Sequence, residues 1–354
     1  MNPESVNQKD IAARAGVSVM TVSKALRNQP KVSAATAERI RTIAAEMGYR
    51  NNPLVAATMA RVAQGRRIVD RPNIAFVTSF ETADGWKQYP HVVRMRAAAL
   101  EKADELGFHM EDLHFRTGRL SGKRLAGIMV ARGILGGVVA PLSNEECEHL
   151  SGDERSLGLE HDRLSWSFIG QPAPDTVFDN VGIDYYRSLF HCVRCLNELG
   201  YDRIGLALSE RESARPQHRF LSSYMAVQYF DSKRRAHYVE PFITSDWTEA
   251  EIQRLCRYVR KEKIQTVMTN NLLVAEALRS DKRKSRPAVF SLHGDVFGPP
   301  IADFGMDQQP ELLAELAVEK LSDNIKLGRS SVPPVPRMTR VRAQFRDYRE
   351  ADAG

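Results

Sequence analysis

The sequence is poor in cysteine and has no long apolar segment. Four cysteines among 354 residues are too few to cross-link a chain of this size, which disfavours a disulfide-stabilised secreted protein. No uninterrupted apolar stretch approaches the roughly 20 residues that a membrane-spanning helix needs. Met1 is followed by polar residues rather than by the apolar core of a signal peptide. We therefore expect a reduced, cytoplasmic protein without a membrane anchor.

Motifs that carry catalysis or bind nucleotides are missing as well. The sequence has no GxGxxG after an apolar strand, no Walker loop, no GxSxG and no HExxH. Cys192 and Cys195 form a CxxC pair in an apparent helix, which indicates buried structural thiols. The other two cysteines, Cys147 and Cys256, are single and distant, so no second pair completes a zinc site. We expect neither an enzyme nor a bound metal or cofactor.

Positive charge is concentrated near the N-terminus. The chain has 50 Lys and Arg residues against 44 Asp and Glu, a net charge of +6. Residues 1–71 hold 12 of the basic and 5 of the acidic residues, or +7, whereas the remainder holds 38 and 39, or −1. A basic module on a near-neutral body is typical of a domain that binds phosphate groups. Ordinary solvated surface charge is the alternative interpretation.

Residues 7–26, NQKDIAARAGVSVMTVSKAL, predict two short helices joined by a tight turn. Asn7 and Ser18 are suited to cap the two helices, and Gly16 between them supplies the positive φ that the turn needs. Apolar residues recur at helical spacing on one side of each helix, namely Ile11, Ala12, Ala15, Val22, Ala25 and Leu26. A helix-turn-helix protein lays the outward N-terminal face of its second helix into the DNA major groove.

A third helix is predicted after Val32, capped by Ser33 and ending at Gly48. With it, the first 50 residues resemble the lactose-repressor/galactose-repressor (LacI/GalR) family of transcription factors. The resemblance is carried by Asp10-Ile11-Ala12, Ala15-Gly16-Val17-Ser18, Thr21-Val22-Ser23, Val32-Ser33 and Gly48-Tyr49.

The resemblance implies which head residues contact DNA. It places Val19, Met20 and Lys24 against base edges. Lys24 is the strong hydrogen-bond donor of the three, whereas Val19 and Met20 offer apolar contact, for example to thymine methyl groups. The implied phosphate contacts come from Asn7, Ser18, Thr21, Ser23, Lys31, Ser33 and Thr36.

The same resemblance makes residues 51–71 a hinge helix and linker between a head at 1–50 and a body at 72–345. Hinge helices of this family insert an apolar wedge into the minor groove. Relatives usually place a leucine nine residues after the tyrosine that matches Tyr49, and this chain has Thr58 there, followed by Met59. Insertion of Met59 from a rotated helix is favoured over a weakly kinked operator, because Pro53 can reset where the helix begins.

After Asn73 the chain alternates apolar runs with helical stretches, in two successive series. Strands are predicted at 74–77, 137–140, 168–169, 203–208, 238–243, 266–268 and 289–291. Helices are predicted at 91–106, 125–135 and 185–200, as one long helix through Tyr224 and Phe230, and from Thr248. This alternation favours α/β lobes with parallel sheets. It resembles the family's two-lobed, periplasmic-binding-protein-like effector domain, in which the chain crosses between lobes three times and residues 301–330 return to the first.

Effector groups are expected at the carboxyl ends of the parallel strands. That rule nominates Ser79, Gln171, Asn270, Asn271, His293 and Asp295. Arg219 resembles the family's effector-contacting arginine. The family often has an aspartate where Asn271 stands and another near Gly170, and their absence removes acceptors for sugar hydroxyls. This disfavours an ordinary pentose or hexose and leaves phosphorylated, acidic or absent effectors open.

Together these features predict a homodimeric transcriptional regulator, in the first instance a repressor, that binds a roughly palindromic operator. A small-molecule effector, related to carbohydrates, is expected to control its DNA affinity. Two alternatives are a DNA-binding head on a purely dimerising domain and a head on a catalytic α/β domain. The C-terminal residues show no leucine heptads, so no tetramer-forming helix is expected.

Overall fold

The computed structural model divides into two compact units, Met1–Ile68 and Val69–Gly354, which are described separately. The structure describes residues 8–26, 32–47, 71–115, 120–142, 157–159, 161–170, 177–214, 217–230, 238–280, 286–294, 301–329 and 332–349. Within these ranges, no helix is both long enough and apolar enough to cross a membrane.

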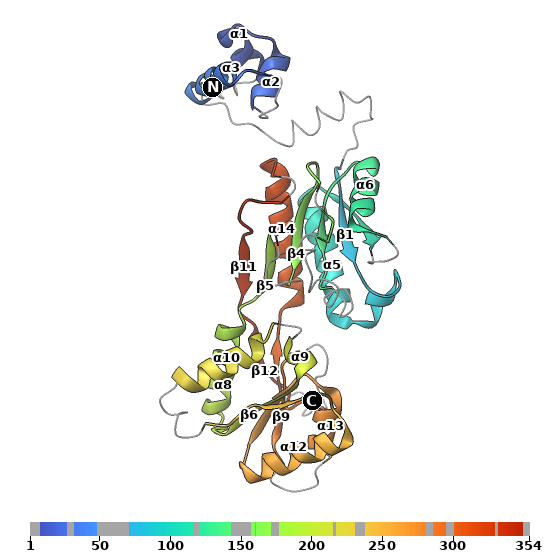
Figure 1. The fold of residues 1–354 in the computed structure, drawn as a ribbon, viewed down its shortest axis with the longest axis vertical. Helices are drawn as coiled ribbons and strands as arrows, with labels where there is room; N and C mark the ends of the chain where they lie inside the picture. Colours follow the sequence, from blue (N-terminus) through green and yellow to red (C-terminus); the bar gives the residue numbers. More distant parts are fainter. Residues whose placement is uncertain are drawn as a thin grey trace. The chain divides into compact units, whose positions relative to one another are not determined.

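The head consists of three helices around a small apolar core (Figure 1). They are α1 (Gln8–Ala15), α2 (Val19–Leu26) and α3 (Ala34–Glu46). The core contains Ile11, Ala12, Ala15, Val22, Ala25, Ala37, Ile40 and Ala44. The periodicity of the first two helices predicted the first five of these, whereas the predicted Leu26 is only partly buried. Gly16 has φ +63° with no atom within 4 Å of an added Cβ, so the turn requires glycine for its backbone and not for space. Arg39 of α3 donates to the Ala15 carbonyl at 3.0 Å and so caps α1.

The first lobe of the body is a six-stranded parallel sheet with the order β11-β5-β4-β3-β1-β2. Its strands are β1 (Asn73–Thr78), β2 (His109–His114), β3 (Ile134–Val139), β4 (Ser165–Ile169), β5 (Asn180–Ile183) and β11 (Met338–Val341). Its helices are η1 (Gly85–Gln88), α5 (Pro90–Glu105), α6 (Gly122–Arg132) and α14 (Pro310–Lys326). The helices α5 and α14 pack on one face of the sheet and α6 packs on the other.

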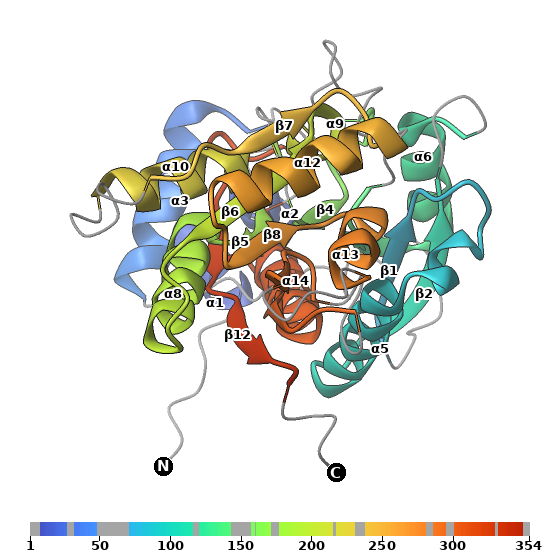
Figure 2. The same cartoon turned by 90° about the horizontal axis from the view of Figure 1, so that it is seen from below.

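The second lobe repeats this plan with the strand order β12-β10-β9-β8-β6-β7. Its strands are β6 (Ile204–Ser209), β7 (Phe242–Thr244), β8 (Thr266–Thr269), β9 (Ala288–Ser291), β10 (Phe304–Asp307) and β12 (Gln344–Asp347), of which β12 is antiparallel to β10. Its helices are α8 (Tyr185–Glu198), α9 (Glu210–Ala214), α10 (Arg219–Phe230), α12 (Glu249–Lys261) and α13 (Leu272–Arg279). The helices α8 and α10 cover one face and α12 and α13 the other (Figures 1 and 2).

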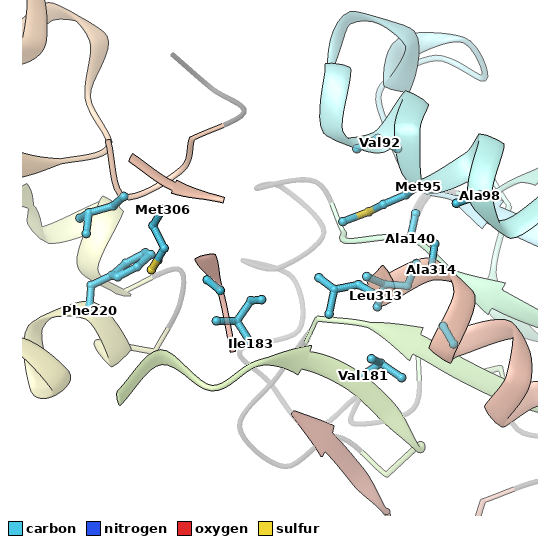
Figure 3. Packing of buried hydrophobic residues seen from close by; sticks show 14 of the residues in the cluster. Val92, Met95, Ala98, Ala140, Val181, Ile183, Phe220, Met306, Leu313 and Ala314 are labelled. Carbon is cyan, nitrogen blue, oxygen red and sulfur yellow. The ribbon is translucent and has the colours of Figure 1, made fainter. Parts of the chain in front are cut away.

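The chain crosses between the lobes three times, as predicted. The crossings run from β5 to α8, from β10 to α14 and from β11 to β12. One apolar cluster contains residues of both lobes; Figure 3 draws Ile183 of β5 between Met306 of β10 and Leu313 of α14. The two sheets are therefore joined by buried side chains as well as by the backbone.

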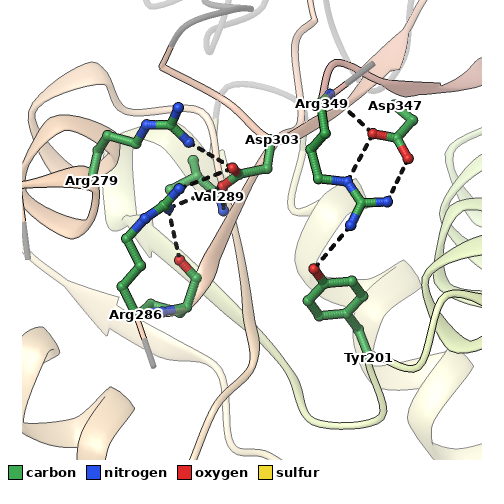
Figure 4. A network of polar contacts seen from close by, with 8 residues as sticks. Tyr201, Arg279, Arg286, Val289, Asp303, Asp347 and Arg349 are labelled. Carbon is green, nitrogen blue, oxygen red and sulfur yellow. Dashed lines mark hydrogen bonds and ion pairs between the residues drawn. The ribbon is translucent and has the colours of Figure 1, made fainter. Parts of the chain in front are cut away.

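An acidic residue connects three elements of the second lobe (Figure 4). Asp303, just before β10, accepts hydrogen bonds from Arg279 of α13 at 2.6 Å, from Arg286 at 3.2 Å and from the Val289 N–H at 2.8 Å. Burial raises the pKa of Asp303, but these hydrogen bonds and the two arginine charges outweigh burial and leave it below its ordinary value.

Two helix predictions in the body were wrong: one helix ends earlier than predicted, and another is divided into two. The helix predicted at 125–135 stops at Arg132, because Gly133 adopts a left-handed C-cap with φ +72°, and β3 begins at once. The long helix predicted through Tyr224 is two helices, α9 and α10. Gln217 and His218, just before α10, both have positive φ, which a continuous helix does not allow.

Two further predictions differ from the structure, one about a strand and one about the path of the chain between the lobes. The strand predicted at 238–243 is confined to Phe242–Thr244. Val239 exchanges hydrogen bonds with the Gln228 side chain at 2.9 and 3.0 Å, so its backbone groups are used by α10 and not by a neighbouring strand. Of residues 301–330, only α14 returns to the first lobe, because β10 pairs with β9 in the second sheet.

Candidate DNA-binding surface and effector site

The N-terminal turn of α2 presents apolar side chains to the outside of the head. Val19 is 42% exposed and Met20 66% exposed, whereas Val22 and Ala25 on the same helix are buried. Lys24, one turn further along, is half-buried. Exposed apolar side chains on a basic domain are typical of an interaction surface, and α2 has the dimensions that fit a major groove.

The helices α2 and α3 begin with the same pair of hydroxyl residues, a serine N-cap and a threonine three residues later. Ser18 accepts a hydrogen bond from the Thr21 N–H at 3.1 Å, and the two hydroxyls are 2.9 Å apart. Ser33 and Thr36 repeat this arrangement at 3.3 and 2.8 Å. Each pair satisfies an otherwise unbonded N–H group and collects hydroxyls at the positive end of a helix dipole, where an anion is favoured.

The structure tests none of the predicted DNA contacts, and some of the residues lie outside the described part of the chain. Asn7, Lys31, Thr58 and Met59 lie outside the described residues, as does the hinge at 51–70. Ser23 lies within α2, but its side chain is also outside the description. These contacts stay predictions.

The predicted effector residues lie at the carboxyl ends of strands in both lobes. Ser79 directly follows β1, Asn270 follows β8 and His293 lies two residues after β9. In each sheet the strand order reverses next to one of these ends, between β1 and β3 and between β6 and β8. Ligands of open α/β sheets bind at such reversals. Gln171 and Asp295 lie outside the described residues.

Asn271 has its side chain engaged at both ends. Its Oδ1 accepts from the Val274 N–H at 3.2 Å and caps α13, and its Nδ2 donates to Glu212 at 2.7 Å. Glu212 in turn accepts from the Ser209 N–H at 2.8 Å and from the Trp247 indole at 2.9 Å. Sequence reasoning missed Glu212, although the strand-end rule would have found it three residues after β6. This geometry favours a positioning role for Asn271.

Arg219 is placed by a strained turn. It begins α10 directly after Gln217 and His218, whose φ angles are 55° and 56°. Gln217 accepts a hydrogen bond from its guanidinium, and the guanidinium carbon lies 5.6 Å from the centre of the Tyr185 ring. Burial lowers the pKa of Arg219. Such strain is often stored at ligand sites, because only the surrounding structure keeps it.

His293 reaches the same region through aromatic contacts. Its ring packs edge-on against Phe220, the residue after Arg219, with centroids 5.9 Å apart. Gln308 lies 3.4 Å from the imidazole and donates to the Leu292 carbonyl at 3.2 Å. Asn270 has a buried side-chain oxygen without a hydrogen-bond partner. Buried acceptors are normally satisfied, so this atom is suited to a donor from a ligand.

The CxxC pair lies on α8, as predicted. Cys192 is fully buried, and burial raises the pKa of its thiol well above the ordinary value. Cys195 is half-buried and contacts His191 at 3.8 Å. Within the described part of the chain, no group of three His, Cys, Asp or Glu side chains is arranged to hold a metal ion.

A shallow groove of about 290 Å³ also opens on α8. It is lined by Tyr186, Arg187, Phe190, His191, Arg194 and Arg342. None of the predicted effector residues contributes to it.

Comparison with known proteins supports both units. Residues 7–52 match a family model described as "Bacterial regulatory proteins, lacI family". The chain is 24% identical over 230 residues to the HTH-type transcriptional regulator DegA of Bacillus subtilis (strain 168), covering 62% of this chain and 60% of DegA. It is 28% identical over 204 residues to the HTH-type transcriptional repressor MelR of the same organism, covering 56% of this chain and 53% of MelR. Each match thus spans less than two thirds of the relative.

Solved structures share the fold along nearly the whole chain. The complex of the transcriptional regulator CelR with cellobiose covers 96% of this chain and 98% of its own, with 19% identity and a TM-score of 0.52. The Lac repressor bound to ONPG in the repressed state covers 97% and 99%, with 17% identity and a TM-score of 0.54. At these identities the likeness shows the fold: a helix-turn-helix head and a two-lobed α/β body.

Proposed function

We propose that this chain is a sequence-specific transcriptional repressor of the LacI family, controlled by a small-molecule effector. The observation that carries the proposal is the exposed N-terminal turn of α2. Val19 and Met20 are solvent-facing on a head that matches the family model, within the N-terminal residues 1–71 that hold the positive charge excess. Exposed apolar residues without a core role are suited to thymine methyl groups.

Phosphate contacts would position the head on the duplex. The hydroxyl pairs Ser18–Thr21 and Ser33–Thr36 sit at two helix N-termini, where backbone N–H groups and the dipole favour an anion. By family position, Asn7, Ser23 and Lys31 would add to this set. Such contacts fix register and strengthen binding without reading sequence.

The body would act as the sensor, with the effector at the strand ends of both lobes. Arg219, His293 and the unsatisfied Asn270 oxygen supply polar groups there, and Ser79 comes from the other lobe. CelR is described in complex with cellobiose, which supports a carbohydrate-related ligand here. A ligand that spans the two lobes would bias their relative orientation, because its affinity differs between arrangements.

We place the protein in the cytoplasm as a homodimer, since paired heads match a palindromic operator. Two helices of the body carry exposed leucines that suit self-association. Leu100 lies with Val93 two turns apart on one face of α5, and Leu272 and Leu273 begin α13. Apolar side chains gathered in this way are typical of subunit interfaces.

Selection of genomic fragments by the full chain, followed by sequencing, tests the function directly. The selected operator should bind the full chain with an affinity that falls steeply with salt, as counterion release requires. Residues 72–354 should not bind it, because the positive excess lies in residues 1–71. Equal binding by the truncated chain, or no sequence enrichment, would contradict the proposal. Turnover of candidate metabolites would instead support a catalytic body.

A further inference from the structure

The outward face of α8 carries two aromatic side chains that the core does not use. Tyr186 is 42% exposed and Phe190 is 43% exposed. They lie about one helical turn apart, and their ring centroids are 6.3 Å from each other. The inward side of the same helix is formed by Leu189, Val193 and Leu196, which are buried and already attach α8 to the core. The two exposed rings therefore have no part in holding α8 in place.

Arg342 reaches this face of α8 from the last crossing between the lobes. Its carbonyl accepts a hydrogen bond from the Gln309 side chain at 2.7 Å, and the N–H of the next residue, Ala343, donates to Ser188 Oγ of α8 at 2.9 Å. Figure 2 shows β12, which begins directly after this crossing, beside α8. The Arg342 guanidinium itself forms no hydrogen bond or ion pair with any residue that the structure describes. Its backbone is thus fixed, whereas its charge is left for an external group.

The groove of about 290 Å³ on α8 brings these side chains together with Arg187, His191 and Arg194. The described residues that line it include no carboxylate. Two acidic residues of the same segment flank the lining residues: Asp184 lies 3.6 Å from Arg187, and Glu198 lies 3.6 Å from Arg194. The groove is therefore aromatic and cationic, and the arginine from the crossing is the one whose charge is not paired.

The size of the groove favours a segment of another protein over a small metabolite. Pockets for small molecules usually measure roughly 300–1,000 Å³ and enclose most of the ligand surface. This groove is smaller and shallow, so it suits a few side chains of a larger partner. Exposed aromatic residues and arginines are also enriched among the side chains that contribute most to binding between proteins.

The charge pattern favours an acidic peptide over a nucleic-acid strand. A nucleic acid carries a negative charge on every nucleotide, so a strand along α8 would meet the carboxylates of Asp184 and Glu198. A peptide can instead place one carboxylate on Arg342 and an apolar side chain on the aromatic rings. Guanidinium and carboxylate groups form paired, charge-assisted hydrogen bonds, which suits a single carboxylate at this position.

We propose that the α8 groove docks an acidic segment of a partner protein. An apolar side chain of that segment packs against Tyr186 and Phe190, and a carboxylate binds Arg342. This surface is distinct from the DNA-binding head and from the strand ends to which the proposed function assigns the effector. The inference therefore does not depend on the identity of the operator or of the effector.

Selection of peptides from a random library displayed on phage, with the full chain as bait, tests the proposal. The basic head also attracts acidic peptides, so an excess of the variant Phe190→Ser/Arg342→Gln is added in solution to remove those that bind elsewhere. The enriched peptides should combine Asp or Glu with Leu, Phe or Trp a few positions away. No enrichment, or enrichment of peptides without acidic residues, would overturn the proposal.

Fluorescence anisotropy of an enriched peptide then locates its contacts. Arg342→Gln and Phe190→Ser should each weaken binding about tenfold or more, the scale of a lost charged hydrogen bond or a lost apolar anchor. Tyr186→Ser is the second apolar variant if Phe190→Ser fails to fold. Arg260→Gln, at an exposed arginine of α12, is the matched control and should leave the affinity unaltered. Equal affinity for all variants would contradict the assignment.

A double-mutant cycle identifies the carboxylate that meets Arg342. Replacing that Glu or Asp of the peptide by its amide should weaken binding to the wild type about tenfold, but have little further effect on Arg342→Gln, because contacting groups are not additive. Additive losses at every acidic position of the peptide would contradict a direct contact.

Two further measurements test other occupants of the groove. An oligothymidylate strand should not displace the labelled peptide, and displacement would assign the groove to single-stranded nucleic acid instead. Sedimentation velocity should give the same mass for Phe190→Ser and the wild type. Dissociation of Phe190→Ser would make the groove a contact between copies of this chain and overturn the proposal of a different partner.

Discussion

The buried Asp179 forms an ion pair with the partly exposed Arg337 at the edge of the first sheet. The Arg337 N–H donates to Asp179 Oδ1 at 2.7 Å, and its guanidinium donates to Oδ2. Asn324 of α14 donates to the same carboxylate at 3.1 Å. Asp179 precedes β5 and Arg337 precedes β11, so this carboxylate connects the last strand of the sheet to its neighbour and to a covering helix.

The pair makes stability depend on pH. Burial raises the pKa of Asp179, but the hydrogen bonds from Arg337 and Asn324 outweigh it and leave the folded pKa below the ordinary 3.8. Such a group stabilises the fold above its unfolded pKa, and that stability is lost as pH falls through the folded pKa. Asp179→Asn should cost about 1–3 kcal/mol at pH 7 and flatten the loss of stability below about pH 4.

Urea unfolding followed by circular dichroism between pH 3 and 7 measures this effect. Asp162→Asn is the control, because the Asp162 side chain is 89% exposed. In Asp179→Asn, the free energy of unfolding should depend less steeply on pH than in the wild type. The dependence should not vanish, because Asp303 also has a lowered pKa. Identical pH profiles for Asp179→Asn and the wild type would contradict the assignment.

Lys24 and Ser33 should contribute to DNA binding in different ways. Lys24→Ala should relax specificity at one base pair per half-site and cost on the order of 1–3 kcal/mol there. Ser33→Ala should weaken all operator variants alike, because a phosphate contact carries no sequence information. Competition binding against a library of operator variants measures both. Lys9→Ala, at an exposed lysine of α1, should at most cause a uniform loss; the same uniform loss for Lys24→Ala would assign Lys24 to the backbone.

Charged substitutions should identify the subunit interface. Leu100→Glu on α5 and Leu273→Glu on α13 should each shift the protein toward monomer, because a buried unpaired charge is costly. Sedimentation velocity over a range of concentrations reports the mass. The matched control is Phe190→Glu on α8, since Phe190 is 43% exposed and Leu100 37%. Dissociation by Phe190→Glu alone would move the interface to α8.

Operator bending should depend on the hinge residue that enters the minor groove. We expect Met59→Ala to abolish bending measured by gel mobility and Thr58→Ala to leave it intact, because the Thr58 hydroxyl would have to lose water between bases. One residue along a helix is a rotation of about 100°, so the two positions are alternatives. Increased bending in Thr58→Leu with no effect of Met59→Ala would favour the weakly kinked operator. No change in any variant would exclude this segment from the DNA.

Periodicity predicted the head well because its contacts are local. The three helices, their glycine turn and two serine caps all follow from residues within a few positions of each other. The strands of the body were found where apolar residues run continuously, as in β1 and β6. The edge strands β2, β11 and β12 were missed because they are half-exposed and polar, for example HMEDLH in β2.

The strand-end rule found positions but not partners. It nominated Asn270 and His293, which lie at the predicted ends. It gave no indication of Arg342, because nothing local in the sequence places this residue beside Phe190 of α8. Asn271 was nominated as an effector residue, but its side-chain amide already bonds Glu212 and caps α13. Contacts between polar groups that are far apart in the sequence cannot be predicted from a single sequence.

The last crossing has a consequence for synthesis of the protein. β11 completes the first sheet and β12 the second, with only Arg342 and Ala343 between them. The ribosome releases residues N-terminal first, at about 5–20 per second. The head can therefore fold early, whereas neither lobe receives its last strand until the final residues emerge. A chain stalled or truncated before Met338 would carry a finished head with two unfinished lobes, and would lack the body to which we assign effector control in the proposed function.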